Sequence, residues 1–300
     1  MTRLIKRFAL LLAALVGWIV PAAAEVPVAA PVAAVARPAL WKIADADTTI
    51  WLFGTVHALP DGVDWLEGPV ADAVKGADQL VTEIPETAPE EMKAAVLKNA
   101  LLPPGKTLRG LLSSTDKARF ERTLSKFGLP VEAFDRFEPW YAAVALTALP
   151  LAQSGYSPAN GVDERIGAEM KRLGRPRIGL ETAEFQFRMF DGLPLAVQKR
   201  YLAEVLDGIG TINEELAAIV REWSAGSPDK LAALLNADED DPRMVKALLT
   251  DRNKTWANWL QQRLAQPGKV FVAVGAGHLA GKDSVQAMLG KAGVTVTRVQ

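Results

Sequence analysis

The stretches TIWLFGTVH (residues 49–57) and VFVAVGAGH (residues 270–278) decide the fold, because each leads from an apolar run through a glycine turn to a histidine. Such a β-branched and aromatic run, followed by glycine, is typical of a buried strand entering a loop. His57 and His278 are the only two histidines of the 300 residues. Loops at the carboxyl ends of strands hold the ligands of α/β proteins, and imidazole suits metal binding and proton transfer. The shared context favours a functional pair over two hydrogen-bonded core histidines.

Two glutamates follow short apolar runs in the same way. Glu83 ends the run QLVTE at residues 79–83, and Glu181 ends RIGLE at residues 177–181. If the four strands lie side by side, two imidazoles and two carboxylates converge at one edge of a sheet. Such a set suits a divalent ion such as Mn, Co, Zn or Fe, and it also offers a general base without a metal. A solvated glutamate or a helix cap is the structural alternative at each position.

The order of the elements predicts an α/β fold with a central, mostly parallel β-sheet flanked by helices and a helical insertion in the middle of the chain. Residues 40–43 and 48–53 indicate a hairpin that turns on aspartates, and residues 294–299 a final strand. Helical periodicity is continuous from residue 242 to about residue 264. The turns and helices between the strands provide the cover on both faces.

Four further positions receive a role from their place in the sequence. Arg252 and Asn253 lie in the helical stretch near the end of the chain, where arginine is suited to bind carboxylates or phosphates, although an exposed helix arginine is the commoner case. Asp163 follows Gly161-Val162 and is most simply the N-terminal cap of a helix. Trp256 is assigned to the core.

The first residues have the pattern of a secretory signal peptide. A basic start is followed by 13 apolar residues, Phe8 to Val20, and by Ala22-Ala23-Ala24, which predicts cleavage after Ala24. We expect a signal peptide over residues 1–24, an Ala- and Pro-rich linker over residues 25–38 and a single domain over residues 39–300. The apolar core is short for a membrane span, so we expect a periplasmic or secreted protein with no stable span after cleavage.

Composition narrows the classes of function. Without residues 1–24, 31 Lys and Arg face 35 Asp and Glu, and no basic stripe stands out, which argues against nucleic acid as a partner. The chain has no cysteine, so thiolate ligands and cysteine nucleophiles are excluded. The chain also has no G-x-S-x-G elbow, no H-E-x-x-H and no P-loop.

The motifs resemble those of the TraB/GumN family across residues 40–299. The resemblance rests on the following segments: residues 40–43, 52–60, 161–163, 179–182 with Gln186, 251–253 and 274–281. One departure is Ala280, where the family typically has proline. The family includes the Tiki metal-dependent peptidases, and it is similar to erythromycin esterases and ChaN-like haem-binding proteins.

The resemblance implies that His57, His278, Glu83 and Glu181 form the site, with Arg252 and Asn253 lining its pocket. The leading hypothesis is an exported metal-dependent hydrolase that acts on a peptide or small-molecule substrate. Among hydrolases, a peptidase is the class we expect. One alternative is a metal-free, esterase-like hydrolase that uses His or Glu as general base. The other is a protein that binds haem or a small ligand without catalysis.

Overall fold

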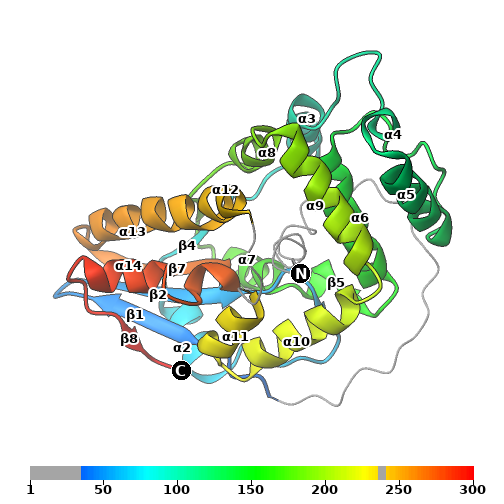
Figure 1. The fold of residues 1–300 in the computed structure, drawn as a ribbon. Coiled ribbons are helices and arrows are strands. Elements are labelled where there is room, and N and C mark those ends of the chain that lie inside the picture. Colours follow the sequence, from blue (N-terminus) through cyan, green and yellow to red (C-terminus); the bar gives the residue numbers. More distant parts are fainter. Residues whose placement is uncertain (1–34, 236–240) are drawn as a thin grey trace.

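The computed structural model describes residues 35–235 and 241–300. The predicted signal peptide and most of the predicted linker lie outside the described residues. The described chain is an α/β structure with a six-stranded sheet flanked by helices (Figure 1). The predicted fold class is therefore confirmed.

The sheet has the strand order β6-β4-β7-β2-β1-β8. The first four strands of this order are mutually parallel. β1 pairs antiparallel with both β2 and the short β8, so β1 alone runs in the opposite direction. A two-residue pair, β3 with β5, forms a separate small sheet. The strands are β1 Leu40–Ala44, β2 Thr48–Thr55, β3 Leu59–Pro60, β4 Gln79–Thr82, β5 Tyr156–Ser157, β6 Arg177–Gly179, β7 Gly268–Gly275 and β8 Thr297–Arg298.

Period-two alternation divides the core into two parts. Ile50 and Leu52 of β2 face the same side of the sheet as Val270, Val272 and Val274 of β7, where they pack against α13 and α14. The alternate residues face α2 and the helices of the middle of the chain. Because both faces are covered, the central strands are apolar on both sides, as the continuous apolar runs in the sequence indicate.

Helices before and after β6 form a second region beside the sheet (Figure 1). Within it α6 packs on α9, and α3 packs on α8. The helices are α2 Gly68–Gly76, α3 Pro89–Asn99, α4 Leu108–Leu111, α5 Ser114–Lys126, α6 Pro139–Ala152, α7 Val162–Arg172, α8 Ala183–Asp191, α9 Leu195–Gly208, α10 Ile212–Ser224, α11 Pro228–Leu235, α12 Pro242–Val245, α13 Asp251–Leu264 and α14 Val285–Lys291.

Two predicted elements differ from the structure. The helix predicted over residues 242–264 is divided into α12, a π-helical turn at Lys246–Thr250, and α13. A π turn is a single turn with i→i+5 hydrogen bonds inside an α-helix, and five residues are too few for sequence periodicity to distinguish it from an α-helical turn. The final strand predicted over residues 294–299 is only the two-residue β8, at an edge of the sheet where β1 is its one partner strand.

The start of α7 is held against the loop that carries His57. The backbone N–H of Val162 donates to the carbonyl oxygen of Val56 at 3.0 Å. A Cβ atom on Gly161 would lie 2.3 Å from the carbonyl oxygen of His57, which leaves no room for any side chain. Glycine at this position therefore allows the contact that brings the first turn of α7 to His57.

We predict that Gly161→Ala lowers the free energy of unfolding by about 1–3 kcal/mol, because the added methyl group must push the two backbones apart. The measurement is urea denaturation followed by circular dichroism. Gly290→Ala is the matched control, since nothing lies within 4 Å of its added Cβ in α14; it should be neutral or stabilise by up to about 1 kcal/mol. Equal stability of the Gly161 variant and the native chain would contradict the close contact.

Candidate functional site

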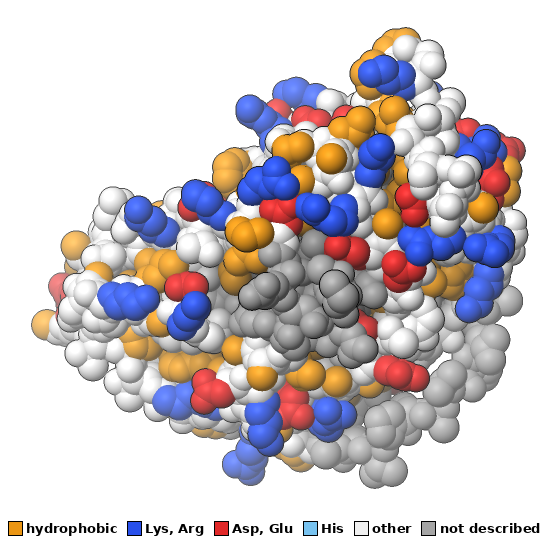
Figure 2. All heavy atoms as spheres, in the orientation of Figure 1, with side chains coloured by type: hydrophobic (Ala, Val, Ile, Leu, Met, Phe, Trp, Pro, Cys, Tyr) orange, Lys and Arg blue, Asp and Glu red, His pale blue; other side chains and the backbone are white. Residues whose placement is uncertain are grey.

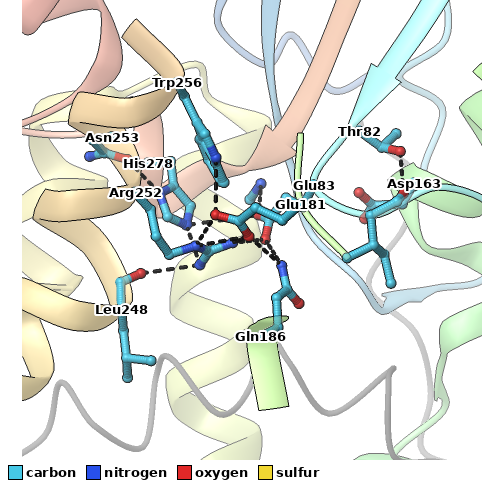
Figure 3. A network of polar contacts seen from close by, with 12 residues as sticks. Thr82, Glu83, Asp163, Glu181, Gln186, Leu248, Arg252, Asn253, Trp256 and His278 are labelled. Atoms are coloured by element: carbon cyan, nitrogen blue, oxygen red, sulfur yellow. Dashed lines mark hydrogen bonds and ion pairs between the residues drawn. The ribbon is translucent and has the colours of Figure 1, made fainter. Parts of the chain in front are cut away.

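The four parallel strands end side by side, so the residues that follow them meet at one edge of the sheet. Glu83 follows β4, Glu181 follows β6, and His278 lies in the turn after β7. His57 lies in the corresponding turn after β2. The structure thus brings the four predicted residues to the same edge. Figure 3 shows Glu83 and Glu181 next to each other, with Arg252 and His278 beside them.

Arg252 of α13 binds both glutamates. Its Nη2 donates to Glu83 Oε2 at 2.5 Å and to Glu181 Oε2 at 2.8 Å, and its Nε donates to Glu181 Oε1 at 2.9 Å. Its Nη1 donates to the carbonyl oxygen of Leu248 in the π turn, at 3.1 Å. Arg252 is only 4% exposed, so the predicted pocket-lining arginine lies inside the protein, where it neutralises part of the charge of two carboxylates.

Two more side chains complete this cluster (Figure 3). Gln186 of α8 donates its Nε2–H groups to Glu83 Oε2 and Glu181 Oε2, both at 3.0 Å. Trp256 of α13 donates Nε1–H to Glu181 Oε1 at 3.0 Å. The indole ring also packs on the imidazole of His278, with 4.4 Å between the ring centroids.

The neighbours of His278 determine which ring nitrogen carries its proton. Arginine has only donors, so His278 Nε2 accepts from Arg252 Nη1 at 3.1 Å and carries no hydrogen. Asn253 donates its Nδ2–H to the carbonyl oxygen of Asp283 and therefore turns Oδ1 toward His278 Nδ1, 2.5 Å away. His278 is thus a neutral ring protonated on Nδ1, and Asn253, which is fully buried, orients it.

His57 has a different partner. Its Nδ1 lies 2.6 Å from Asp163 Oδ2, and both side chains are partly exposed, at 17% and 14%. Asp163 occupies the first turn of α7, whose N-cap is Gly161 and not the aspartate. The expected capping role of Asp163 was wrong, because its carboxylate turns to the imidazole. With Nδ1 bound to a carboxylate, Nε2 of His57 is the nitrogen left for chemistry.

The two imidazoles have opposite electrostatic surroundings. Burial lowers the pKa of His57, but the charge and the hydrogen bond of Asp163, with Glu83 nearby, raise it above its ordinary value. Burial lowers the pKa of His278 to about 3, and the Arg252 charge acts in the same direction. Burial raises the pKa of Glu83, yet Arg252, the two imidazoles and the Gly275 N–H outweigh it and hold that pKa well below the usual range. Glu83 is therefore a carboxylate at neutral pH.

A cavity of about 750 Å³ opens beside His57. One wall is the loop after β4, and the other is a face of α7. Glu83, Asp163 and Gln186 also line the cavity, whereas Glu181, Arg252, Asn253 and His278 do not. The site therefore has a layer that faces the cavity, which contains His57, and a buried layer behind it.

The predicted metal ligands do not form a ligand set in this arrangement. The described residues contain no group of three or more His, Asp or Glu side chains placed to hold a metal ion. Glu83, Glu181 and His278 all direct side-chain atoms at the guanidinium group of Arg252. A divalent ion bound by these atoms would lie beside a fixed positive charge, so the residues as arranged do not fit a metal.

Sequence reasoning missed the roles of Asp163, Gln186 and the Trp256 indole N–H. Asp163 and Gln186 belong to the segments that carry the family resemblance, but no local pattern indicated their roles, because their partners are distant in the sequence. Trp256 is buried in the core as predicted, but the core assignment says nothing about its hydrogen bond. The spacing of Arg252, Asn253 and Trp256 places all three on one helix face, which was a usable signal.

The chain thus combines an α/β fold with a histidine in each of two G-x-x-H turns, after β2 and β7, and a buried Glu-Arg-Glu cluster at the ends of β4 and β6. The chain belongs to the TraB/PrgY/gumN family, which it matches over residues 39–298. An uncharacterized protein of Treponema pallidum (strain Nichols) is 22% identical over 276 residues, with 82% of this chain and 78% of that protein covered. The uncharacterized protein YbaP of Escherichia coli (strain K12) is 25% identical over 241 residues, covering 79% and 86%. No solved structure matches the chain. Within residues 35–235 and 241–300, none of the helices has the length and apolar character needed to cross a membrane.

We predict that Arg252→Met lowers the free energy of unfolding by about 3–5 kcal/mol, because it leaves two buried carboxylates without their cation. Chemical denaturation measures the difference. Arg172→Met is the matched control: Arg172 pairs with Glu169 on α7 and is 66% exposed, so it should lose at most about 1 kcal/mol. Similar losses of unfolding free energy in the two variants would show that the Arg252 cluster stabilises the fold no more than an exposed ion pair does.

We also predict two distinct titrations for the two histidines, which give the only imidazole signals of the chain. In ¹⁵N-edited NMR, His57 should gain its proton at a pH above 6.5, and His278 should stay neutral down to about pH 3. Asp163→Asn should lower the pKa of His57, because burial continues to disfavour the charged ring once the carboxylate is gone. A His278 ring that titrates near pH 6.5 would contradict the neutral Nδ1–H form described above.

Proposed function

We propose that the chain is a hydrolase that cleaves an amide or ester bond in the cavity beside α7, with His57 as the residue that transfers protons. The observation that carries this proposal is the His57–Asp163 pair on the cavity wall. A carboxylate on Nδ1 holds the imidazole in the tautomer with a free Nε2 and stabilises the imidazolium that forms. The pair supports a general base that is oriented before the substrate arrives.

In the proposed reaction, Nε2 of His57 removes a proton from a water molecule while its oxygen bonds to the substrate carbonyl carbon. The imidazolium then gives that proton to the leaving nitrogen or oxygen as the bond to carbon breaks, which returns His57 to its neutral form. Glu83 lines the same cavity, and its negative charge stabilises the imidazolium form of His57. Arg252 and Gln186 keep this carboxylate ionised and in place.

Peptides are the first substrate class to test, because the family resemblance includes peptidases and because the cavity extends along α7. The experiment is digestion of a proteome-derived peptide library by the purified protein, with new chain ends identified by mass spectrometry. We expect His57→Gln and Asp163→Asn to lower the cleavage rate by about 10²–10⁴-fold, the usual contribution of a general base. Asp207→Asn is the matched control, since Asp207 is exposed and pairs with Arg119 away from the cavity.

The same digestion is repeated with EDTA. Activity that survives the chelator but is lost in both variants supports the proposal. Activity that is unchanged in His57→Gln overturns it.

A metal-dependent hydrolase is the second candidate, and the closeness of Glu83 to both imidazoles favours it. Glu83 Oε1 lies 3.8 Å from His278 Nε2, and its charge acts on His57 as well. Binding of a Mn, Co, Zn or Fe ion at these residues would require Arg252 to leave its present partners. Near-stoichiometric metal by elemental analysis, lost in the His57→Ala/His278→Ala double variant, together with inhibition by EDTA, would select this candidate.

We further propose that the protein acts in the periplasm or outside the cell after cleavage behind Ala24, on the evidence of the N-terminal pattern. N-terminal sequencing of the protein recovered from the producing cells tests this directly. A first residue of Glu25 supports it, and an intact Met1 in the cytosol contradicts it.

A further inference from the structure

The cavity beside His57 separates its charges along α7. Asp163, Glu164, Gly167, Ala168 and Lys171 line it, which is one face of this helix. Asp163 and Lys171 are eight residues apart, or about 12 Å along a helix axis. The acidic side chains thus mark the end where His57 lies, and a lysine marks the other end. Gly167 and Ala168 lie between these two ends, so only one methyl group projects from α7 into the middle of the groove.

The end away from His57 is basic. Arg175, which precedes β6 and lies 3.8 Å from Asp78, and Arg177, the first residue of β6, line it together with Lys171. Glu86 is the acidic residue that lines this end, and it pairs with Lys171 at 3.0 Å through two exposed side chains. An exposed pair of this kind is weak. On the face drawn in Figure 2, by contrast, acidic and basic side chains are interspersed.

Arg177 is the central member of this basic end. Its Nε donates to Thr82 Oγ1 at 2.9 Å and its Nη2 donates to the carbonyl oxygen of Ile84 at 3.4 Å, so both of these partners are neutral. Among the described residues no carboxylate lies within ion-pair distance of Arg177. Its guanidinium lies against Gly167, where an added Cβ would be 3.1 Å from Nη1. A half-buried guanidinium that already faces the groove suits a carboxylate supplied by a ligand.

We propose that this groove binds an extended peptide whose carboxylate group is held by Arg177, Lys171 and Arg175, while the chain runs toward His57. Gly167 is about 6 Å from Asp163 along the helix and Lys171 is about 12 Å away. At about 3.3 Å per extended residue, the carboxylate lies two to four residues from the bond at His57. This inference rests on the proposed function for the bond that is cut, and it adds the charge and spacing of the substrate.

A carboxylate of this kind has two sources, an acidic side chain and a free chain terminus. Three unlabelled hexapeptides distinguish them: Gly-Ser-Ala-Gly-Ser-Asp amide, Gly-Ser-Ala-Gly-Ser-Asn with a free carboxyl end, and the same Asn peptide as its amide. Binding is measured by saturation-transfer NMR on the His57→Gln protein, so that no cleavage interferes. At least one charged peptide should bind about fivefold tighter than the neutral one, as expected for a partly exposed ion pair.

Arg177→Gln and Lys171→Gln should each reduce this preference, and the double variant should abolish it. The control is Arg172→Gln, because Arg172 is the neighbour of Lys171 on α7 but does not line the cavity. Lys171 is exposed, so its variant tests the basic end even if Arg177→Gln disturbs the loop after β4. Equal binding of the three peptides, no binding of any, or a preference that survives the double variant overturns the inference.

Failure of the carboxylate-binding groove and failure of the proposed hydrolase give different results. A carboxylate preference that depends on Arg177, without cleavage by the native protein, supports the groove and rejects the hydrolase. Cleavage of library peptides with no acidic group or chain terminus two to four residues from the cut rejects the groove and keeps the hydrolase.

Discussion

The ion cluster around Arg252 is the constraint on which the rest of the site depends. Two carboxylates at the edge of a covered sheet are tolerated only with a cation and enough hydrogen-bond donors. Arg252 supplies the cation, and Gln186 and Trp256 supply further donors. These residues come from α8 and α13, so the cluster ties two helices to the ends of β4 and β6. The position of Glu83 relative to His57 follows from this arrangement.

The two G-x-x-H turns show how one local motif acquires two chemical characters. His278 is buried beside the Arg252 guanidinium group, and both the burial and this positive charge favour the neutral imidazole. His57 lies at a cavity and faces a carboxylate, which favours the charged form. The backbone turn therefore delivers a histidine to the sheet edge, and the surrounding helices determine what that histidine does. One imidazole orients and supports the cluster, while the other is available to a substrate.

Much of the fold was predictable, because β2 and β7 each contain a continuous apolar run that is followed by a glycine. The convergence of His57, His278, Glu83 and Glu181 was predictable for the same reason, since parallel strands end at one edge. The side chain that each of these four residues contacts was not predictable. Whether Glu181 meets a metal ion or Arg252 depends on how α13 is rotated, and the π turn at Lys246–Thr250 that precedes α13 leaves no clear periodic signal. Asp163 likewise acquires its role only through the contact of Gly161 with the His57 loop.

The strand order has a consequence for how the molecule is made. β7 lies between β2 and β4 in the middle of the sheet, yet it is the second-to-last strand of the chain. β2 and β4 therefore have no common partner until the final segment of the polypeptide is available to insert between them. During synthesis, the edges of the earlier strands stay unpaired and exposed, and such edges are prone to mispairing. A nearly complete polypeptide therefore remains without its central strand, and deletion of the last 33 residues, Gly268 to Gln300, would remove the centre of the sheet together with its edge strand β8.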